Sequence, residues 1–94
     1  MSMVLEFEWD AHKAIQNMQN HRVSFEEAKS VFNDPLLLTF LDPEHSDHEH
    51  RSINIGISSH ARILLVVFTD RRGKVRLISS RKATAKERKL YETY

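Results

Sequence analysis

Two different spacings of apolar residues follow one another at the start of the chain. Residues Val4–Trp9 alternate between apolar and polar side chains, which predicts a short first strand. From Ala11 to Asn20 the apolar residues instead recur every three or four positions, the spacing that places side chains on one face of a helix. Asp10 directly precedes this run and is suited to accept a free backbone N–H group as an N-cap. The pattern predicts a strand followed by an amphipathic helix.

A capping motif predicts a second helix. Ser24 and Glu27 form the pattern S-x-x-E, in which the serine side chain bonds forward and the glutamate side chain reaches back. The helix is expected to end before Pro35, which cannot continue it. The apolar segment Leu36–Leu41 lies between two prolines and is predicted to be a strand. The buried stripe of the second helix is predicted to consist of Phe25, Ala28, Val31 and Phe32.

The second half of the chain has the pattern of three further strands. Arg51–Ser58 alternates and places three isoleucines on one face, whereas Arg62–Thr69 is apolar on both faces and suits a central strand. Asp70–Gly73 is predicted to be a turn in which the glycine takes a positive φ, and Lys74–Ser80 returns as the hairpin partner. The isoleucines are Ile53, Ile55 and Ile57.

A second capping motif, Thr84–Glu87, begins the last predicted helix. This helix carries Leu90, Tyr91 and Tyr94. The predicted order is therefore β-α-α-β-β-β-β-α, an α+β fold in which helices pack on an antiparallel sheet. With 94 residues, 40% of them apolar and 29% charged, we expect a single domain over residues 1–94.

Charge is distributed unevenly between the two halves, although the net charge is only +1. Residues 1–50 hold three cations and ten acids, a net charge of −7, whereas residues 51–94 hold eleven cations and three acids, a net charge of +8. This asymmetry indicates that one face meets a polyanion such as a nucleic acid, unless the two halves neutralise each other across the fold.

The chain contains no cysteine, which excludes disulfides and thiolate–metal sites. It also has no secretory signal pattern at its start and no apolar run long enough to span a bilayer. We therefore expect a soluble, cytoplasmic protein that does not bind a membrane.

Three of the six histidines lie within residues 45–50, the sequence HSDHEH. Imidazole and carboxylate groups are zinc ligands, but a structural zinc site needs about four converging ligands. The spacing here lacks the helical geometry of an H-E-x-x-H motif. We therefore expect a polar loop with no native metal and no cofactor. A histidine-loop metalloprotein, adventitious metal capture and an acid–base role are the alternatives.

Histidine and glutamate side chains near several arginines suit the cleavage of RNA without a metal ion. RNA supplies its own nucleophile, the 2′-hydroxyl, so that an enzyme needs a base, a cationic clamp for the phosphate and an acid for the leaving oxygen. On an antiparallel sheet the arginines of neighbouring strands can gather on one face. The basic residues that recur along the predicted strands are Arg51, Arg62, Arg76, Arg81 and Lys82.

Four ordered segments resemble a known family. They contain the patterns F-E-W-D-x-x-K-A, H-S-x-x-E-x-R before an I-x-I-G strand, and I-S-x-R-x-A-T-x-x-E-R. Their order and spacing over residues 6–92 resemble BrnT, the small ribonuclease toxins of type II toxin–antitoxin modules. The segments are Phe7–Asn17, His21–Pro35, Asp42–Gly56 and Val75–Glu92.

The resemblance to BrnT implies a RelE-like fold and a metal-independent endoribonuclease that inhibits translation and growth. It also implies neutralisation by a cognate BrnA-type antitoxin with a ribbon-helix-helix part. The toxin is then expected to dimerise within a heterotetramer and to meet operator DNA only through the antitoxin, while its own basic face meets the RNA substrate.

Residue by residue, the resemblance implies five catalytic candidates. Arg81 and Arg51 would clamp the phosphate, Glu49 or His21 would act as base or acid, and Lys13 would add supporting charge. We expect a further set to bind RNA outside the chemistry, with the aromatic member stacking on a base. This set is Arg62, Arg76, Lys82 and Tyr91.

Other interpretations of the same residues remain open. Lys13 also suits an exposed helix position, His21 suits a hydrogen-bonded helix end, and Glu87 and Arg88 suit capping and surface pairing. A non-catalytic module that binds RNA or an acidic protein through its basic face fits the same charges. The chain also departs from the family at Asn20-His21-Arg22, where K-H-G is common, and so lacks the glycine that readily ends a helix.

Overall fold

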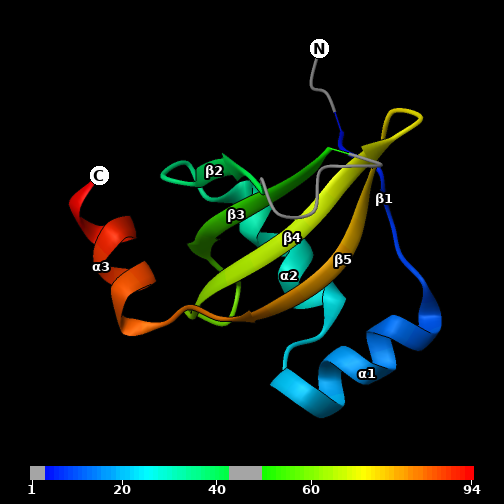
Figure 1. The fold of residues 1–94 in the computed structure, drawn as a ribbon, viewed down its shortest axis with the longest axis horizontal. Coiled ribbons are helices and arrows are strands. Elements are labelled where there is room, and N and C mark those ends of the chain that lie inside the picture. The colour runs from blue at the N-terminus through cyan, green and yellow to red at the C-terminus, as the bar shows by residue number, and fades with distance from the viewer. Residues whose placement is uncertain (1–3, 43–49) are drawn as a thin grey trace.

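The computed structural model describes residues 4–42 and 50–94, and its elements follow the predicted order (Figure 1). The order β-α-α-β-β-β-β-α is confirmed for the residues described, and the fold is α+β. The elements are β1 (Phe7–Glu8), α1 (Ala11–His21), α2 (Phe25–Ser30), the short 3-10 helix η1 (Val31–Asn33), β2 (Leu38–Leu41), β3 (Arg51–Ile57), β4 (Ile63–Arg71), β5 (Lys74–Lys82) and α3 (Ala85–Thr93).

The sheet is mixed, so the prediction of an antiparallel sheet is wrong for one strand. Its five strands lie in the order β1-β5-β4-β3-β2, and β2 to β5 pair antiparallel with their neighbours. In contrast, β1 pairs parallel with β5, with Phe7 opposite Val75. The two helices that follow β1 carry the chain away from its edge, and β5 later returns alongside β1 in the same direction. β1 is also shorter than the predicted Val4–Trp9.

The edge of β5 beyond β1 is occupied by α1. The carboxamide of Asn17 donates to the carbonyl oxygen of Ser80 at 2.8 Å and accepts from the backbone N–H of Ser80 at 2.9 Å. It also donates to the carbonyl oxygen of Val23 at 2.9 Å. One buried side chain therefore satisfies the backbone of β5 where a further strand would otherwise do so.

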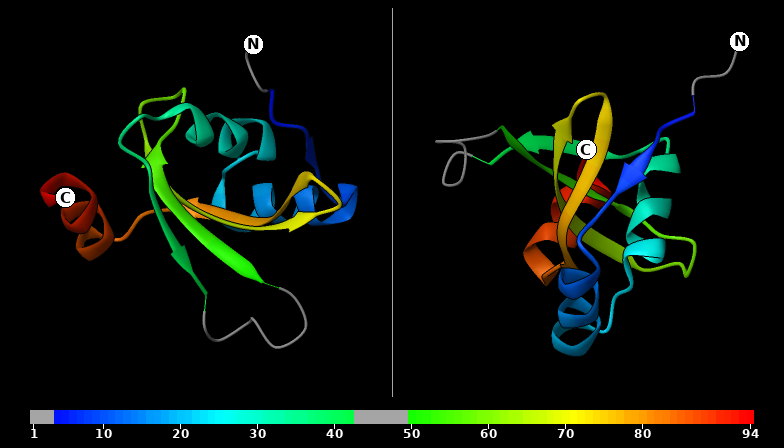
Figure 2. Two further views of the ribbon diagram at one scale, coloured as in Figure 1. Left: turned by 90° about the horizontal axis from the view of Figure 1, so that it is seen from above. Right: turned by 90° about the vertical axis from the view of Figure 1, so that its right-hand side faces the viewer.

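The two faces of the sheet are covered differently (Figure 2). The face toward α2 carries the core, which consists of Val23, Phe25, Ala28, Val31, Leu64, Val66 and Leu77. Because side chains alternate along a strand, the predicted isoleucine row of β3 lies on the opposite face, here called the outer face. On this face Ile55 and its partner Leu65 are buried, and α3 packs against β3.

The predicted helix caps form to different extents. Asp10 caps α1 by accepting a backbone N–H three residues on, and Thr84 and Glu87 form both bonds of a capping box at α3. At α2 only half of the predicted box is present: the Ser24 hydroxyl accepts from the N–H of Glu27 at 3.0 Å. The Glu27 side chain does not reach back, because it is buried and bound elsewhere.

The turns explain most differences in strand boundaries. The backbone N–H of Leu36 donates to the Asp34 carboxylate at 2.9 Å, so that β2 begins at Leu38 and not at Leu36. The β4–β5 turn consists of two residues, Arg72 and Gly73, which both have a positive φ, 54° and 79°. Because the turn is this short, β4 continues to Arg71. The histidine-rich segment 43–49 lies outside the described residues.

None of the helices formed by residues 4–42 and 50–94 has the length and apolar character that a membrane-spanning helix requires.

Candidate functional site

Two of the predicted catalytic residues lie together on α1. Lys13 and His21 are two turns apart on this helix and line one hollow with Ile78 and Ser79 of β5. Both side chains are exposed. The hollow exists because α1 is docked on the edge of β5 through Asn17, so that the helix face next to the sheet meets the outer side of the strand. The structure therefore assembles a cationic side chain and an imidazole around one small concave surface.

Arg81 lies next to this hollow. It follows Ser79 by two residues on β5, so its side chain points to the same outer face, with the two Cα atoms about 7 Å apart. Its guanidinium donates to both carboxylate oxygens of Glu87, at 2.8 and 3.0 Å. Bidentate binding of this kind is also how arginine binds phosphate, so Glu87 occupies the donors that a phosphate would use.

The Arg81–Glu87 pair is stably ionised. The hydrogen bonds from Arg81 hold the pKa of Glu87 below its usual value, against the opposing effect of burial. The bond to Glu87 in turn raises the pKa of Arg81. Glu87 also accepts from the backbone N–H of Thr84 at 2.8 Å, which fixes the first turn of α3 to the arginine. A ligand anion must therefore compete with a charged, anchored carboxylate.

Arg51 is not assembled with Arg81. It is the first residue of β3 and pairs with Thr69, whereas Arg81 pairs with Leu65 across the other side of β4. Arg51 and Arg81 are two strand spacings apart across the sheet and four residues apart along the strands. At standard strand dimensions this is about 16 Å between their Cα atoms. Glu49 lies outside the described residues. The predicted pair of arginine clamps is thus spread over the outer face.

Arg62, predicted to bind RNA, is engaged in the fold. Its Nε donates to Oε2 of the buried Glu27 at 2.9 Å, its Nη2 bonds Oε1, and the same Nη2 reaches the carbonyl oxygen of Arg22 at 3.1 Å. The Ser58 hydroxyl donates to Glu27 at 2.7 Å, and His60 Nδ1 lies 3.2 Å from it. This cluster ties the β3–β4 turn to α2.

The charge of Glu27 is held by its partners. Burial raises the pKa of the Glu27 carboxyl, but the hydrogen bonds from Arg62 and Ser58 outweigh burial and lower the pKa below its ordinary value. Because the side chain is only 2% exposed, its ionised state depends on these contacts.

The other three predicted RNA-binding residues differ in availability. Arg76 forms an ion pair with Glu8 at 3.4 Å, and the Tyr91 hydroxyl donates to Oδ2 of Asp34 at 2.5 Å. This hydrogen bond, together with burial and the carboxylate charge, raises the pKa of Tyr91 to about 12. Lys82 is exposed, and within the described residues it has no ion-pair partner. Of the four, only Lys82 has both an exposed side chain and an uncommitted charge.

Asp34 connects three elements. Besides Tyr91 of α3 and the N–H of Leu36, its carboxylate accepts the N–H of Ile57 at 2.8 Å. Burial raises its pKa, but the hydrogen bonds from the Ile57 N–H, Tyr91 and the Leu36 N–H lower it overall. The Asp34 carboxylate can come this close to β3 because residue 56 is glycine: a Cβ atom there would lie 3.1 Å from the Asp34 Oδ2.

The sequence analysis does not identify the carboxylate partners of Arg62 and Arg81, which are Glu27 and Glu87. A signal was present for Glu27, which lies four residues before Val31 and so within the predicted apolar stripe of the helix. A charged residue in such a stripe is typical of a buried ion pair. No comparable local signal marks Asn17 or Asp34, whose partners lie far away in the sequence.

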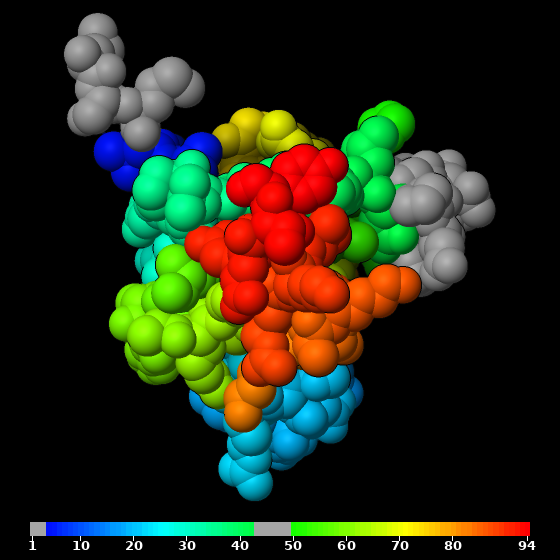
Figure 3. Space-filling view, turned by 90° about the vertical axis from the view of Figure 1, so that its left-hand side faces the viewer, coloured from blue at the N-terminus to red at the C-terminus, as the bar shows by residue number. Residues whose placement is uncertain are grey.

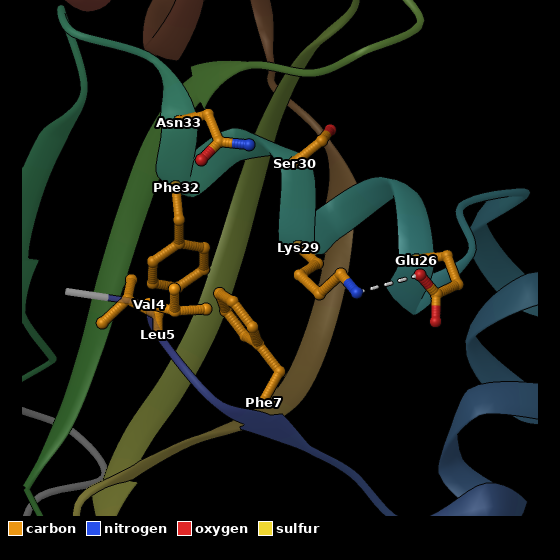
Figure 4. Close-up of a pocket in the computed structure, with 8 residues that line it drawn as sticks. All are labelled: Val4, Leu5, Phe7, Glu26, Lys29, Ser30, Phe32 and Asn33. Atoms are coloured by element: carbon orange, nitrogen blue, oxygen red, sulfur yellow. Dashed lines mark ion pairs between the residues drawn. The ribbon is translucent and has the colours of Figure 1, made fainter. Parts of the chain in front are cut away.

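A larger hollow lies on the other side of the molecule, between the chain start and α2 (Figure 4). Its volume is about 580 Å³, and none of the predicted site residues lines it. Lys29 pairs there with Glu26 at 3.3 Å and lies 5.9 Å from the centre of the Phe7 ring. Its charged groups are thus already paired with each other.

Across residues 4–42 and 50–94, no three potential ligand side chains gather closely enough to hold a metal ion. His45 and His48 of the histidine-rich segment lie outside this part of the chain.

The chain matches one protein family over most of its length. Residues 9–87 match the BrnT_toxin family, described as "Ribonuclease toxin, BrnT, of type II toxin-antitoxin system". Among solved structures the chain is similar to the Brucella abortus ribonuclease toxin, BrnT, with a TM-score of 0.63 and 21% sequence identity. The alignment covers 86% of this chain and 99% of that chain, and at this identity it shows a shared fold. A sequence search of the curated proteins finds no match.

Proposed function

Because the chain belongs to the BrnT family of ribonuclease toxins of type II toxin–antitoxin systems, we propose that it is an endoribonuclease that needs no metal ion. Its cleavage of RNA would inhibit translation and growth. The observation that carries this proposal is the hollow in which Lys13 and His21 face Ser79, with Arg81 beside it. We also propose a RelE-like arrangement of a single domain.

The chemistry follows from the groups around this hollow. The 2′-oxygen of the substrate attacks the neighbouring phosphorus atom while a base accepts its proton, and the 5′-oxygen leaves with a proton from an acid. The products are a 2′,3′-cyclic phosphate and a free 5′-hydroxyl, so no water is consumed in this step. An imidazole has one nitrogen that can accept a proton and one that can donate a proton, which suits His21 to one of the two proton transfers.

Arg81 has the geometry for the charge that develops on the phosphate. Two of its N–H groups already bind two oxygens of the Glu87 carboxylate in parallel, at 2.8 and 3.0 Å. A phosphate that displaces this carboxylate meets the same pair of donors and gains a partner whose charge is permanent. Lys13 adds a second positive charge across the hollow. Arg51 and Glu49 remain candidates for substrate contacts beyond it.

The test is cleavage of RNA by the purified toxin in the presence of a chelator, compared with Arg81→Ala and Arg81→Lys. We expect wild-type cleavage to leave 2′,3′-cyclic ends, and Arg81→Ala to lose about 10²–10³-fold in kcat, the usual effect of removing one electrostatic donor. Arg81→Lys keeps the charge but loses the bidentate geometry, and should recover only part of the rate.

Arg72→Ala, in the exposed β4–β5 turn, removes the same charge elsewhere and serves as the control. Folding of each variant is checked by circular dichroism. Cleavage by Arg81→Ala at the wild-type rate would remove Arg81 from the site. Binding of RNA without any cleavage by the wild type would favour the non-catalytic module.

The partner implied by a type II family is an antitoxin. We propose that it is of the BrnA type, with a ribbon-helix-helix part that binds operator DNA, in a heterotetramer with two copies of this chain. Co-purification with the neighbouring antitoxin and a mass measurement of the complex test this assembly. A complex with one toxin copy would overturn the proposed dimer.

A further inference from the structure

A third concave surface lies where the sheet ends and α3 begins. The backbone N–H of Ala83 donates to the carbonyl oxygen of Ile63 at 2.9 Å, which joins the end of β5 to the start of β4. The chain then turns into α3, so the first turns of this helix stand beside the β3–β4 turn (Figure 3). The hollow between them has a volume of about 340 Å³ and is lined by Ala61, Arg62, Ile63, Lys82, Ala83 and Arg88.

The cations of this hollow are not equally neutralised. Arg62 is paired with the buried Glu27, so its charge is neutralised and its side chain is held at one side of the hollow. The nearest acid on α3, Glu87, is bound to Arg81. Lys82 and Arg88, in contrast, have no ion-pair partner in the part of the chain that the structure describes. Two like charges in one hollow repel each other, and an anion placed between them relieves this repulsion.

The floor of the hollow leaves room for such an anion. Its two alanines have small side chains, and Ala61 adopts a left-handed backbone with φ 59°, which keeps the β3–β4 turn tight. The turn is held in place by the Ser58 hydroxyl, which accepts the N–H of His60 at 3.2 Å and binds Glu27. These contacts fix the backbone of the β3–β4 turn on one side of the hollow.

The position of the hollow identifies the anion. Lys82 directly follows Arg81, and because side chains alternate along a strand the two point to opposite sides of the end of β5. A chain of phosphates that passes Arg81 on the outer face can therefore continue around this end of the strand into the hollow. RNA carries such a chain of phosphates, with one charge per nucleotide.

We propose that Lys82 and Arg88 bind a backbone phosphate of single-stranded RNA that flanks the cleaved phosphate. Arg62 is a positioning residue that holds the wall of this subsite. The inference rests on the proposed ribonuclease function and adds to it the direction in which the substrate leaves the cleavage site.

The test measures binding of the full-length protein to a 2′-O-methyl oligoribonucleotide, which lacks the attacking hydroxyl and cannot be cleaved. The variant is Lys82→Ala with Arg88→Ala. Its matched control is Lys86→Ala with Lys89→Ala, which removes the same charge from two exposed positions of the same helix. Affinity is measured as a function of salt concentration.

We expect the Lys82/Arg88 variant to bind about tenfold more weakly at low salt. For single-stranded RNA each neutralised phosphate contributes about 0.7 to the slope of log K against log salt, so losing the one phosphate contact of this subsite lowers the slope by about 0.7. The Lys86/Lys89 control should change the slope by less than half of that. With cleavable RNA, the Lys82/Arg88 variant should show a raised KM and an unchanged kcat.

Equal slopes for the two double variants would overturn the subsite, as would a loss of antitoxin binding without any loss of RNA binding. A wild-type protein that does not bind RNA at all would instead overturn the proposed function. Failure of the subsite and failure of the function are therefore distinguishable in one set of titrations.

Discussion

Two arginine–glutamate pairs lie on opposite faces of the sheet, and their surroundings differ. The Glu27 side chain is 2% exposed and is contacted by Arg62, Ser58 and His60, whereas the Glu87 side chain is 23% exposed and faces the outer side. The first pair closes a turn onto α2, and its arginine binds both Glu27 and the carbonyl oxygen of Arg22. The second pair holds its arginine at the surface beside the candidate cleavage site. The Arg62–Glu27 pair thus stabilises the fold, whereas in the Arg81–Glu87 pair a ligand anion can replace the carboxylate.

The two faces also differ in how their helices are held. α2 contributes the buried residues Phe25 and Ala28 to the core, but α3 has no buried residue. The polar contacts of α3 are the Glu87–Arg81 pair with β5 and the hydrogen bond from Tyr91 to Asp34, which lies between η1 and β2. Elements held by few buried apolar contacts open with a lower free energy than the core. We therefore expect α3 to open locally before the sheet unfolds.

The largest effect is expected for Glu27→Gln. This change keeps the shape of the side chain but leaves the Arg62 guanidinium without its carboxylate, and breaking a buried pair costs about 3–5 kcal/mol. The measurement is urea unfolding at pH 7. Glu26→Gln is the matched control, because Glu26 precedes Glu27 on the same helix, is exposed, and forms a surface ion pair with Lys29. If Glu26→Gln lost as much unfolding free energy as Glu27→Gln, the buried pair would not be more important for stability than an exposed one.

The pH dependence of the same variant sharpens this result. The folded pKa of Glu27 is lowered, so its stabilising contribution is complete above the unfolded value of 4.5 and is lost as the pH falls through the folded value. The difference in unfolding free energy between the wild type and Glu27→Gln should therefore shrink below pH 4.5. A constant difference would show that the charge of Glu27 does not matter.

A smaller effect is expected for Tyr91→Phe, which removes the hydrogen bond between α3 and Asp34. Bonds to charged groups contribute about 1.5–3 kcal/mol, so the loss should lie in this range at pH 7. Because the folded pKa of Tyr91 is raised to about 12, the contribution is complete below pH 10 and is lost as the pH rises through about 12. Unfolding and amide exchange of α3 at pH 7 and 11 measure both parts, with Tyr94→Phe as the exposed control.

Glu87→Gln should act on binding more than on stability. The pair is partly exposed, so its loss should cost less than about 1 kcal/mol of unfolding free energy. Since Arg81 then loses its competing carboxylate, affinity for non-cleavable RNA should rise about fivefold, equivalent to about 1 kcal/mol. Glu92→Gln changes the net charge equally on the same helix, and an equal gain in that variant would show a general charge effect.

The smallest effect is expected for Arg22→Gly at the end of α1. Arg22 adopts the left-handed conformation with φ 58° and caps the helix through its backbone N–H. Glycine relieves the strain of this conformation but is more flexible in the unfolded chain, for a net gain of about 0.5 kcal/mol. Asn20→Gly, inside the helix, should instead destabilise by about 0.3 kcal/mol in the same thermal unfolding measurement, because asparagine is already a poor helix former.

Local patterns predict the elements of this fold because each element is decided by residues close in sequence. The alternation over Arg51–Ser58, the Asp10 cap and the turn before Gly73 are examples. The parallel pairing of Phe7 with Val75 joins residues far apart in the chain, and no local pattern reports it. The motif S-x-x-E correctly predicts the helix start at Ser24, but only half of the capping box forms because Arg62, distant in sequence, binds its glutamate.

The candidate site was predictable in its residue types but not in its geometry. Lys13 and His21 come together because both lie on one face of α1, which helical spacing predicts. The separation of Arg51 from Arg81 depends on strand order and register, which the sequence pattern does not contain. The availability of each arginine depends on a distant partner such as Glu27.

The contact between Asn17 and Ser80 has a consequence for self-association. A sheet edge with free backbone groups is a template on which other chains can add strands and aggregate. The Asn17 carboxamide bonds both the N–H and the carbonyl oxygen of Ser80, so an incoming strand finds neither group of this residue available. A single side chain thus protects the edge of β5 at Ser80, beyond the part that the short β1 covers.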